Sequence, residues 1–442
     1  MKRRTISLAL VICLAAVLAA SPVLAGEPFR YTDNVQKVVL PNGVTLLLKE
    51  NPAFDVIALV LTSKVGSVQD PVGLEGLTYL TQRNLLSGTT NRTAAEVVAE
   101  VESLGVQMQA LAAPNFAAVY LQALPDTFAA GLEILLDVVA NSTFPQAEFE
   151  RERELGMAAL QSVLDDPQNA VLLAYLEAFY GDHPYKYTAY GSLEGLAAVS
   201  AELLPDWKEY IYAPEHLVVA VVGNFQADEL LPLLEETLGS LQSSYAGTVV
   251  PREEVPFTYP LENREFAINI PLDAAFLIMG YPAPDTFDED SAAMTVITSV
   301  LGGGFSSRLN MEIRDRLGLA YAVFAQYDQR LGPSNFFTYV VTHPSNLDLV
   351  KEQIVQQVGR IASEGLTDEE IAEVAAFERG MYLLGNETNL AQAFLLAQAE
   401  ITGRGYGWVD EYMTFFDNVT TEDIKRVAQK YFQYYTSFVV GP

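Results

Sequence analysis

The sequence predicts an α+β protein of two similar domains joined by a linker. The chain has 442 residues, which is too long for one ordinary hydrophobic core. Strand-like and helix-like patterns of apolar residues follow one order in the first half and return in a similar order in the second. Residues 243–256, between the halves, are rich in Ser, Gly and Pro and are typical of a linker. We therefore expect an N-terminal domain over 26–242 and a C-terminal domain over 257–442.

The first 25 residues have the pattern of a secretory signal peptide. Basic residues at positions 2–4 precede an apolar run over 6–20, and a small-residue cleavage site follows at 23–25. Cys13, the only cysteine, follows an isoleucine where a lipoprotein site would need a small residue, which disfavours a lipid anchor. We expect the mature chain to begin at Gly26 and to be secreted, with the periplasm as its destination.

The composition of the mature chain excludes several kinds of function. Loss of three basic and no acidic residues changes the formal net charge from -30 to -33. Phosphate backbones would repel so acidic a chain, so nucleic-acid binding is not expected. No cysteine remains for a disulfide framework, a thiolate nucleophile or a thiolate metal site. No later stretch is apolar for long enough to span a bilayer.

The N-terminal half opens with a β-hairpin. Pro41-Asn42-Gly43 lies between two apolar runs, and Asn-Gly in that setting is the strongest short hairpin signal. The apolar spacing predicts the elements that follow: a strand over 56–65, helices over 74–87 and 93–104, β-structure over 106–123 broken near Pro114-Asn115, helices over 128–140 and 147–164, and a buried strand over 217–223.

The C-terminal half repeats this order. Its patterns predict a strand over 275–280, a helix over 291–301, a helix near Met311, strands over 319–327 and 336–342, and a helix over 347–362. Thr367 and Glu370 form a capping box for one more helix. The two halves also share a short motif: Arg316-Leu317-Gly318-Leu319 is similar to Ser103-Leu104-Gly105-Val106. The chain therefore looks duplicated.

Short motifs in both halves resemble the pitrilysin, or insulinase-like, superfamily (peptidase family M16). They occur in the order and at the spacing of that family: Leu40-Pro41-Asn42-Gly43, Val65-Gly66-Ser67, Gly73-Leu74, Gly76-Leu77, Ser87-Gly88-Thr89, Tyr180-Gly181-Asp182-His183-Pro184-Tyr185, Gly302-Gly303-Gly304, Ser307-Arg308-Leu309 and Gly318-Leu319-Ala320-Tyr321. The resemblance implies two homologous pitrilysin-like α/β-sandwich domains, each an antiparallel sheet covered by helices.

The zinc motif of the family is degenerate in this chain. Active members carry H-x-x-E-H in the slot between Leu77 and Ser87, with two histidines on zinc and the glutamate as general base. Here the slot reads Tyr79-Leu80-Thr81-Gln82-Arg83, and the position of the third ligand falls at about Ala159. The resemblance therefore implies that this chain binds no zinc or other cofactor by itself. We expect structural roles for the three histidines, at positions 183, 216 and 343.

A pair of residues that assists catalysis in relatives is retained in the second half. In the family, an Arg and a Tyr seven residues later reach toward the zinc-bearing half and polarise the scissile carbonyl. Arg314 and Tyr321 have this spacing, and both side chains can donate hydrogen bonds to an oxygen that gains negative charge. The alternative is a helix-surface arginine and a tyrosine packed in the core. Gly302, Gly303 and Gly304 are either a tight turn or, as in relatives, part of the substrate chamber.

The resemblance implies a zinc-free subunit of a heterodimeric peptidase. A partner subunit of the same family would carry H-x-x-E-H and the zinc, and the two chains would enclose a chamber for peptide substrates. A non-enzymatic scaffold and a periplasmic peptide-binding protein, the latter as a homodimer, remain alternatives. A self-sufficient zinc peptidase is not expected, because the ligands are missing.

Overall fold

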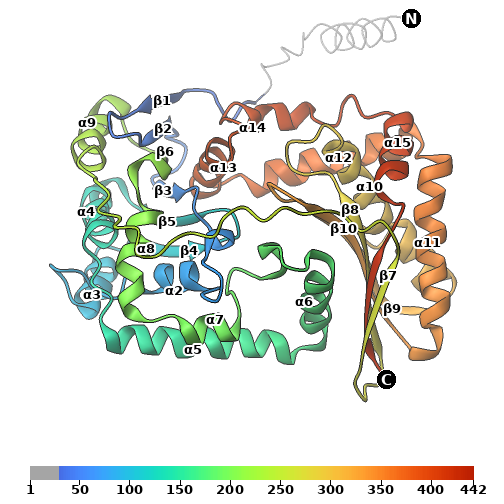
Figure 1. The fold of residues 1–442 in the computed structure, drawn as a ribbon. Coiled ribbons are helices and arrows are strands. Elements are labelled where there is room, and N and C mark those ends of the chain that lie inside the picture. Colours follow the sequence, from blue (N-terminus) through green and yellow to red (C-terminus); the bar gives the residue numbers. More distant parts are fainter. Residues whose placement is uncertain (1–28) are drawn as a thin grey trace, which may run out of the picture.

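The computed structural model describes residues 29–442, which form two halves, each built around one β-sheet (Figure 1). The predicted signal peptide and Cys13 lie outside the described residues. The predicted fold class, α+β with two similar domains whose sheets are covered by helices, is confirmed. In the described part of the chain, none of the helices combines the length and the apolarity that crossing a membrane requires.

The sheet of the N-terminal half has six strands in the order β1-β2-β6-β3-β5-β4. The predicted hairpin is confirmed, because β1 and β2 pair antiparallel around Gly43, whose φ of 99° lies in the region that favours glycine. The other predicted strands are confirmed as well. The bounds are β1 Val35–Val39, β2 Thr45–Glu50, β3 Ile57–Ser63, β4 Gln107–Ala112, β5 Ala117–Ala123 and β6 Leu217–Gly223.

The sheet of the C-terminal half has five strands in the order β7-β11-β8-β10-β9. Its strands are β7 Arg264–Asn269, β8 Ala275–Ala283, β9 Ala320–Asp328, β10 Ser334–Thr342 and β11 Thr436–Gly441. This order matches β2-β6-β3-β5-β4 strand for strand, so the duplication expected from the sequence is present in the topology.

The expectation of purely antiparallel sheets needs one correction. In each half, the last strand runs parallel to one of its neighbours: β6 is parallel to β2, and β11 is parallel to β7. All other neighbours are antiparallel. Parallel neighbours need a long crossover, and the helices of each half supply it.

One face of each sheet is covered by helices of the same half. In the N-terminal half these are α2 Leu77–Asn84, α3 Ala94–Ser103, α4 Pro125–Asn141, α5 Gln146–Asp165, α7 Leu193–Ala198, α8 Leu204–Ile211 and α9 Ala227–Leu238. In the C-terminal half they are α10 Ser291–Gly302, α11 Leu347–Glu364, α12 Asp368–Gly385 and α15 Thr421–Tyr431. The short helix α14, Trp408–Glu411, contacts α13 and contributes Val409 to the core on the N-terminal sheet. Helix α2 is shorter than predicted because it begins only after Gly76, whose φ is 111°.

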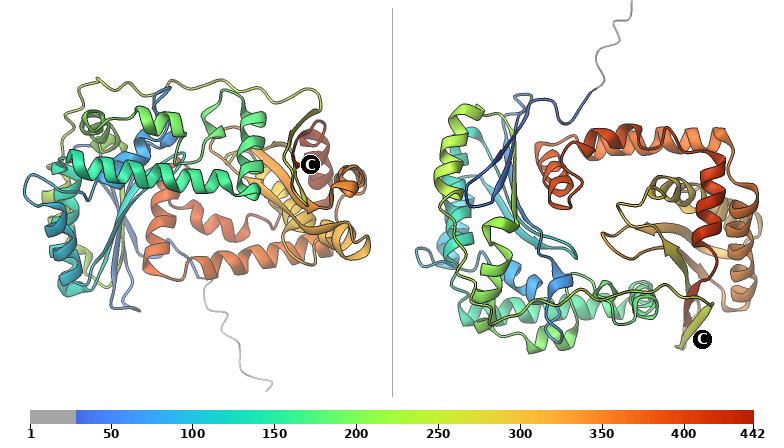
Figure 2. Two further views of the ribbon diagram at one scale, coloured as in Figure 1. Left: turned by 90° about the horizontal axis from the view of Figure 1, so that it is seen from below. Right: turned by 45° about the horizontal axis from the view of Figure 1, so that its top comes forward.

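The other face of each sheet is covered by a helix from the opposite half. Helix α6, Pro167–Tyr180, packs on the C-terminal sheet, and α13, Asn389–Ile401, packs on β3 and β6. Figure 2 shows the long helices α5 and α12, which precede the exchanged helices, running between the halves on opposite sides. Because strands β3 and β6 are covered on both faces, every residue in them is buried.

The segment between the sheets contacts both halves. No helix or strand forms between the end of α9 at Leu238 and the start of β7 at Arg264. On the N-terminal side, the buried Arg252 guanidinium pairs with Glu75 (2.5 Å). On the C-terminal side, the Tyr259 hydroxyl donates a hydrogen bond to the Ala283 carbonyl (3.0 Å). The predicted linker lies within this anchored segment.

Candidate functional site

The residues of the degenerate zinc motif lie on α2, and two of them, Tyr79 and Arg83, contact α5. Tyr79, Gln82 and Arg83 are three and four positions apart, so they share one face of the helix. Tyr79 packs against Gly156 of α5, where a Cβ atom would lie 2.8 Å from the ring. Its ring also contacts that of Tyr190, with 4.9 Å between centroids.

Gln82 is a buried structural side chain. It is 1% exposed, and its amide oxygen accepts a hydrogen bond of 2.9 Å from the Tyr212 hydroxyl. An amide at this position holds its partner but cannot take up a proton as the general base of an active relative would.

Arg83 is held by an ion pair with Glu152 of α5. The guanidinium nitrogens Nη2 and Nε lie 2.7 and 2.9 Å from the Glu152 carboxylate, whose side chain is only 7% exposed. Sequence reasoning missed Glu152, although one signal was present. Glu152 lies seven residues before Ala159, and residues two turns apart share a helix face. Ala159 itself is partly buried and offers no ligand atom.

The residues in this slot do not fit a zinc ion. They present a phenol, an amide and a guanidinium, and the one nearby carboxylate is already paired with the guanidinium. A fixed positive charge at Arg83 opposes a second cation at the same place. Among residues 29–442, no three or more His, Cys, Asp or Glu side chains are grouped so that they could hold a metal ion.

Arg314 lies in a π-helical segment, Asn310–Arg316, which replaces the ordinary helix predicted near Met311. Its guanidinium lies 5.7 Å from the ring centroid of Phe305 and donates a weak hydrogen bond to Asn310 (3.4 Å). The side chain remains 40% exposed. Isolated π-helical turns are rare and often occur at functional sites.

Tyr321 protrudes from the edge strand β9 at a β-bulge. In β10, Val341 pairs with Ala322 and the following residue, Thr342, pairs with Ala320. Tyr321, which lies between Ala320 and Ala322, therefore has no partner in β10. The side chain is 65% exposed, which rules out the alternative of a tyrosine packed in the core. Bulges redirect side chains and are frequent beside active sites. A hydrogen bond of 3.1 Å from the Gly318 amide to the Arg314 carbonyl ties the preceding turn to the Arg314 segment.

The three glycines at 302–304 differ in their surroundings. Gly302 is buried against β9, and a Cβ atom there would lie 2.1 Å from the Ala325 nitrogen, so its small size is required by packing. Gly303 and Gly304 line a surface pocket of about 330 Å³ beside Arg308. The prediction that the glycines bind substrate therefore applies to Gly303 and Gly304, and not to the buried Gly302.

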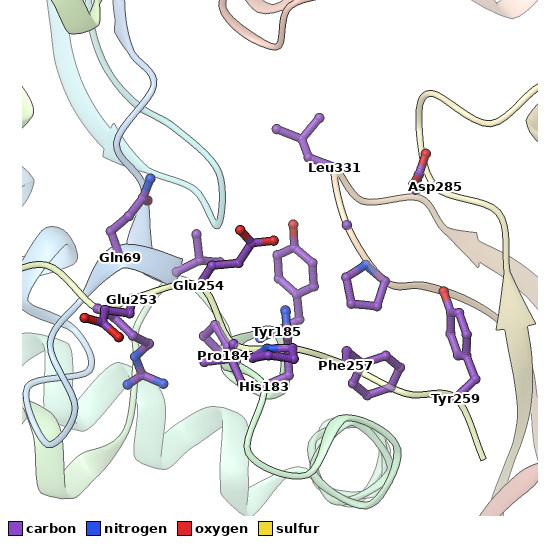
Figure 3. Close-up of a pocket in the computed structure, with 16 residues that line it drawn as sticks. Gln69, His183, Pro184, Tyr185, Glu253, Glu254, Phe257, Tyr259, Asp285 and Leu331 are labelled. Atoms are coloured by element: carbon purple, nitrogen blue, oxygen red, sulfur yellow. Dashed lines mark hydrogen bonds between the residues drawn. The ribbon is translucent and has the colours of Figure 1, made fainter. Parts of the chain in front are cut away.

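A second cavity, of about 620 Å³, lies where the linker meets both halves (Figure 3). Its walls include His183 and Tyr185 from the N-terminal half, Phe257 from the segment between α9 and β7, and Leu331 from the C-terminal half. His183 is 8% exposed, and its Nδ1 accepts a hydrogen bond from the Tyr185 amide (3.2 Å). Burial, together with nearby guanidinium groups, lowers the pKa of His183 to about 4.

His183 should make the protein less stable in mild acid. Because its pKa is lower in the folded chain than in the unfolded chain (about 6.5), the unfolded state binds more protons between these values. The contribution is complete above the unfolded pKa and is lost as the pH falls toward 4. Between pH 7.5 and pH 5 we expect His183 to lower the free energy of unfolding by about 2 kcal/mol. Urea unfolding of His183→Asn should show a shallower pH dependence than the wild type.

His343 offers a matched control for this measurement. Its Nδ1 also accepts from the backbone amide two residues later, at 3.2 Å, but the side chain is exposed. His343→Asn makes the same substitution at a turn of the same geometry that is exposed to solvent. Equal slopes for His183→Asn and the wild type would contradict the assignment. The third histidine, His216, has its Nδ1 2.8 Å from the Tyr210 carbonyl, which is a structural contact like the other two.

Comparison with known families agrees with the fold. Residues 45–192 match the family described as insulinase (peptidase family M16), and residues 198–376 match the peptidase M16 inactive domain. Together the two matches cover most of the chain. The second match begins before β6, so its boundary does not coincide with the division between the two sheets.

Several bacterial relatives resemble the chain over nearly its full length. An uncharacterized zinc protease of Mycobacterium leprae is 26% identical over 92% of both chains. One from Bacillus subtilis is 23% identical, over 90% of this chain and 96% of the relative.

Two solved structures share the fold. A protease from Helicobacter pylori superimposes with a TM-score of 0.83 at 20% identity, over 92% of this chain and 99% of that one. A peptidase M16 inactive domain from Pseudomonas fluorescens gives a TM-score of 0.82 at 21% identity, over 92% and 98%. With both family matches in place along a duplicated fold, the chain belongs to peptidase family M16.

Proposed function

We propose that this chain is the zinc-free subunit of a two-chain M16 peptidase that degrades peptides. In this proposal it supplies half of the substrate chamber and places Arg314 and Tyr321 beside the zinc site of a partner subunit. The partner carries H-x-x-E-H and the metal. The chain is exported through its signal peptide and acts in the periplasm.

The observation that carries the proposal is the exposure of Tyr321 on its β-bulge. A side chain that served only packing would be buried, whereas this phenol is 65% exposed and has no partner residue in β10. Arg314 is also partly exposed and has only weak contacts within the chain. Both side chains are therefore free to donate hydrogen bonds to a group from outside the chain.

The ion pair at the position of the zinc motif supports a peptidase in which one chain holds the metal and the other chain supplies Arg314 and Tyr321. Arg83 and Glu152 form an ion pair where active relatives have the zinc motif, so the catalytic metal has to come from elsewhere. The residues that assist at the transition state lie in the other half of this chain. A subunit that has lost the metal and kept an exposed Arg-Tyr pair is suited to complementing a second subunit.

Reconstitution tests the proposal. The mature chain, residues 26–442, is purified alone and mixed with an M16 subunit from the same organism that carries H-x-x-E-H. Zinc content is measured by mass spectrometry and cleavage with an internally quenched peptide. We expect no stoichiometric zinc and no cleavage for this chain alone, and faster cleavage by the mixture than by the partner alone.

The other outcomes each point to a different function. Zinc binding and cleavage by this chain alone would overturn the proposal. A stable complex of the two subunits that leaves the partner's activity unchanged would favour a scaffold. A homodimer that binds the peptide without cleaving it, and ignores the partner, would favour a peptide-binding protein.

A further inference from the structure

Strand β7 forms an outer edge of the C-terminal sheet, and its charged residues, Arg264 and Glu265, are both at its start. It is the end strand of the sheet order β7-β11-β8-β10-β9, and β11 is its one neighbour in the sheet. Residues 265–270 are all exposed. Natural proteins usually protect such edges with charged residues, proline or a bulge. Residues 266–270 read Phe-Ala-Ile-Asn-Ile and contain no charge and no proline.

The hydrogen bonds to β11 show which backbone groups of β7 face outward. The amides of Arg264 and Ile270 donate to the carbonyls of Tyr435 (2.9 Å) and Gly441 (2.7 Å). In a parallel pair, residues that alternate along the strand point their amide and carbonyl groups to the same side. The even-numbered residues therefore bond to β11. The amide and carbonyl groups of residues 265, 267 and 269 point away from the sheet.

The side chains of the even-numbered residues form an apolar face beside this free edge. Phe266, Ile268 and Ile270 are 42%, 45% and 40% exposed. Phe266 stacks on its register partner Phe438, with 6.1 Å between ring centroids. These side chains lie on the face of the sheet that α6 covers, because Phe438 packs in the core beneath α6.

A groove lies along the same face of β7. It has a volume of about 790 Å³ and is formed by Ile268 together with residues of α5 and α6, among them Leu164 and Leu173. Glu177 and Glu194 outnumber Lys186 at its margin. An extended chain beside β7 would place alternate side chains over this groove.

We propose that β7 binds an extended peptide segment as an added β-strand, with apolar side chains over the groove and basic residues between them. The outward amide and carbonyl groups of Ala267 and Asn269 supply main-chain hydrogen bonds, which is how exposed sheet edges capture peptides. The residues between the apolar ones point to the opposite face of the sheet, as the side chain of Glu265 does. This carboxylate, which also pairs with Lys351 (2.7 Å), and the formal net charge of -30 favour basic residues there. This site is separate from Arg314 and Tyr321 and does not depend on the proposed catalytic role.

A proline at position 267 tests the backbone contact. Its amide is not used within the sheet, and proline is tolerated in edge strands where the missing amide faces solvent. Ala267→Pro should therefore fold but lose an outward donor. Ala267→Val keeps the donor and is the matched control. Ile268→Asp places a charge in the apolar face and provides a second test that is independent of the backbone.

Fluorescence anisotropy gives the measurement, with the mature chain alone and a chelator present. The probe is a labelled, capped ten-residue peptide of alternating valine and lysine. We expect saturable binding that weakens at least tenfold in Ala267→Pro and in Ile268→Asp and less than twofold in Ala267→Val. A valine-glutamate peptide should bind more weakly than the probe.

Three results would overturn the proposal. One is the absence of binding to a monomeric wild type, and another is equal binding by all variants. The third is that light scattering shows the wild type to be a dimer that does not bind the peptide, and shows Ala267→Pro to be a monomer. That result would assign the edge to a second copy of this chain. The Arg314 and Tyr321 variants should bind the probe normally, so failure of this site and failure of the proposed peptidase function are distinguishable.

Discussion

Replacing Arg314 with alanine, or Tyr321 with phenylalanine, should slow peptide cleavage by the two-subunit complex at least tenfold and up to about a hundredfold. Each substitution removes a donor that would bind the oxygen of the scissile carbonyl as it gains negative charge. A tenfold loss corresponds to about 1.4 kcal/mol of transition-state stabilisation. Because the interaction strengthens only in the transition state, kcat and kcat/KM should fall together while KM changes little.

Two side chains of the same half serve as controls of matched residue type for these kinetics. Arg316 is an exposed arginine two positions from Arg314 and pairs with Glu312. Tyr434 is a tyrosine with 38% exposure in a different part of the same half. Arg316→Ala and Tyr434→Phe should leave kcat within about twofold of the wild type. Unchanged kcat in Arg314→Ala and Tyr321→Phe, with the complex intact by gel filtration, would show that the pair has no catalytic role.

Substituting Gly280 with alanine should destabilise the packing between the halves by about 3 kcal/mol. Gly280 lies in β8 beneath α6, and an added Cβ would lie 1.9 Å from the Tyr175 hydroxyl oxygen. That hydroxyl is held by the buried Asn335 side chain at 3.1 Å, so the ring cannot move away freely. A lower melting temperature in calorimetry, and earlier proteolysis within α6, would show the effect.

A double-mutant cycle separates this clash from a general loss of stability. Tyr175→Leu removes the atoms that the new methyl group would meet, although it leaves a cavity and an unpaired Asn335. Gly280→Ala should therefore cost much less in the Tyr175→Leu background than in the wild type. Equal costs in the two backgrounds would contradict the close approach of α6 to β8.

Much of the candidate site could be located from the sequence. The spacing of Tyr79, Gln82 and Arg83 placed them on one helix face, and the seven-residue step from Arg314 to Tyr321 followed a family pattern. The sequence did not predict what these residues contact. Glu152 is 69 positions from Arg83 in the chain, and only the packing of α5 on α2 brings its carboxylate to the guanidinium.

The local elements were determined by the sequence itself. Pro41-Asn42-Gly43 produced the opening hairpin because it forms a three-residue loop, in which the Gly43 amide donates to the Leu40 carbonyl (2.9 Å) and Gly43 takes the positive φ of 99°. Thr93 and Thr367 begin α3 and α12 through capping boxes that close within four residues. Signals of this kind act between neighbours in the chain, so they can be read without the fold.

The tertiary structure alone decided where the exchanged helices pack and how the site residues are exposed. Helices α6 and α13 are apolar enough to cover a sheet, but their own sequences do not say which sheet they cover. The bulge that exposes Tyr321 depends on its register with Thr342, which arises only when β9 pairs with β10. Such outcomes depend on contacts between residues far apart in the chain, and local patterns carry no information about them.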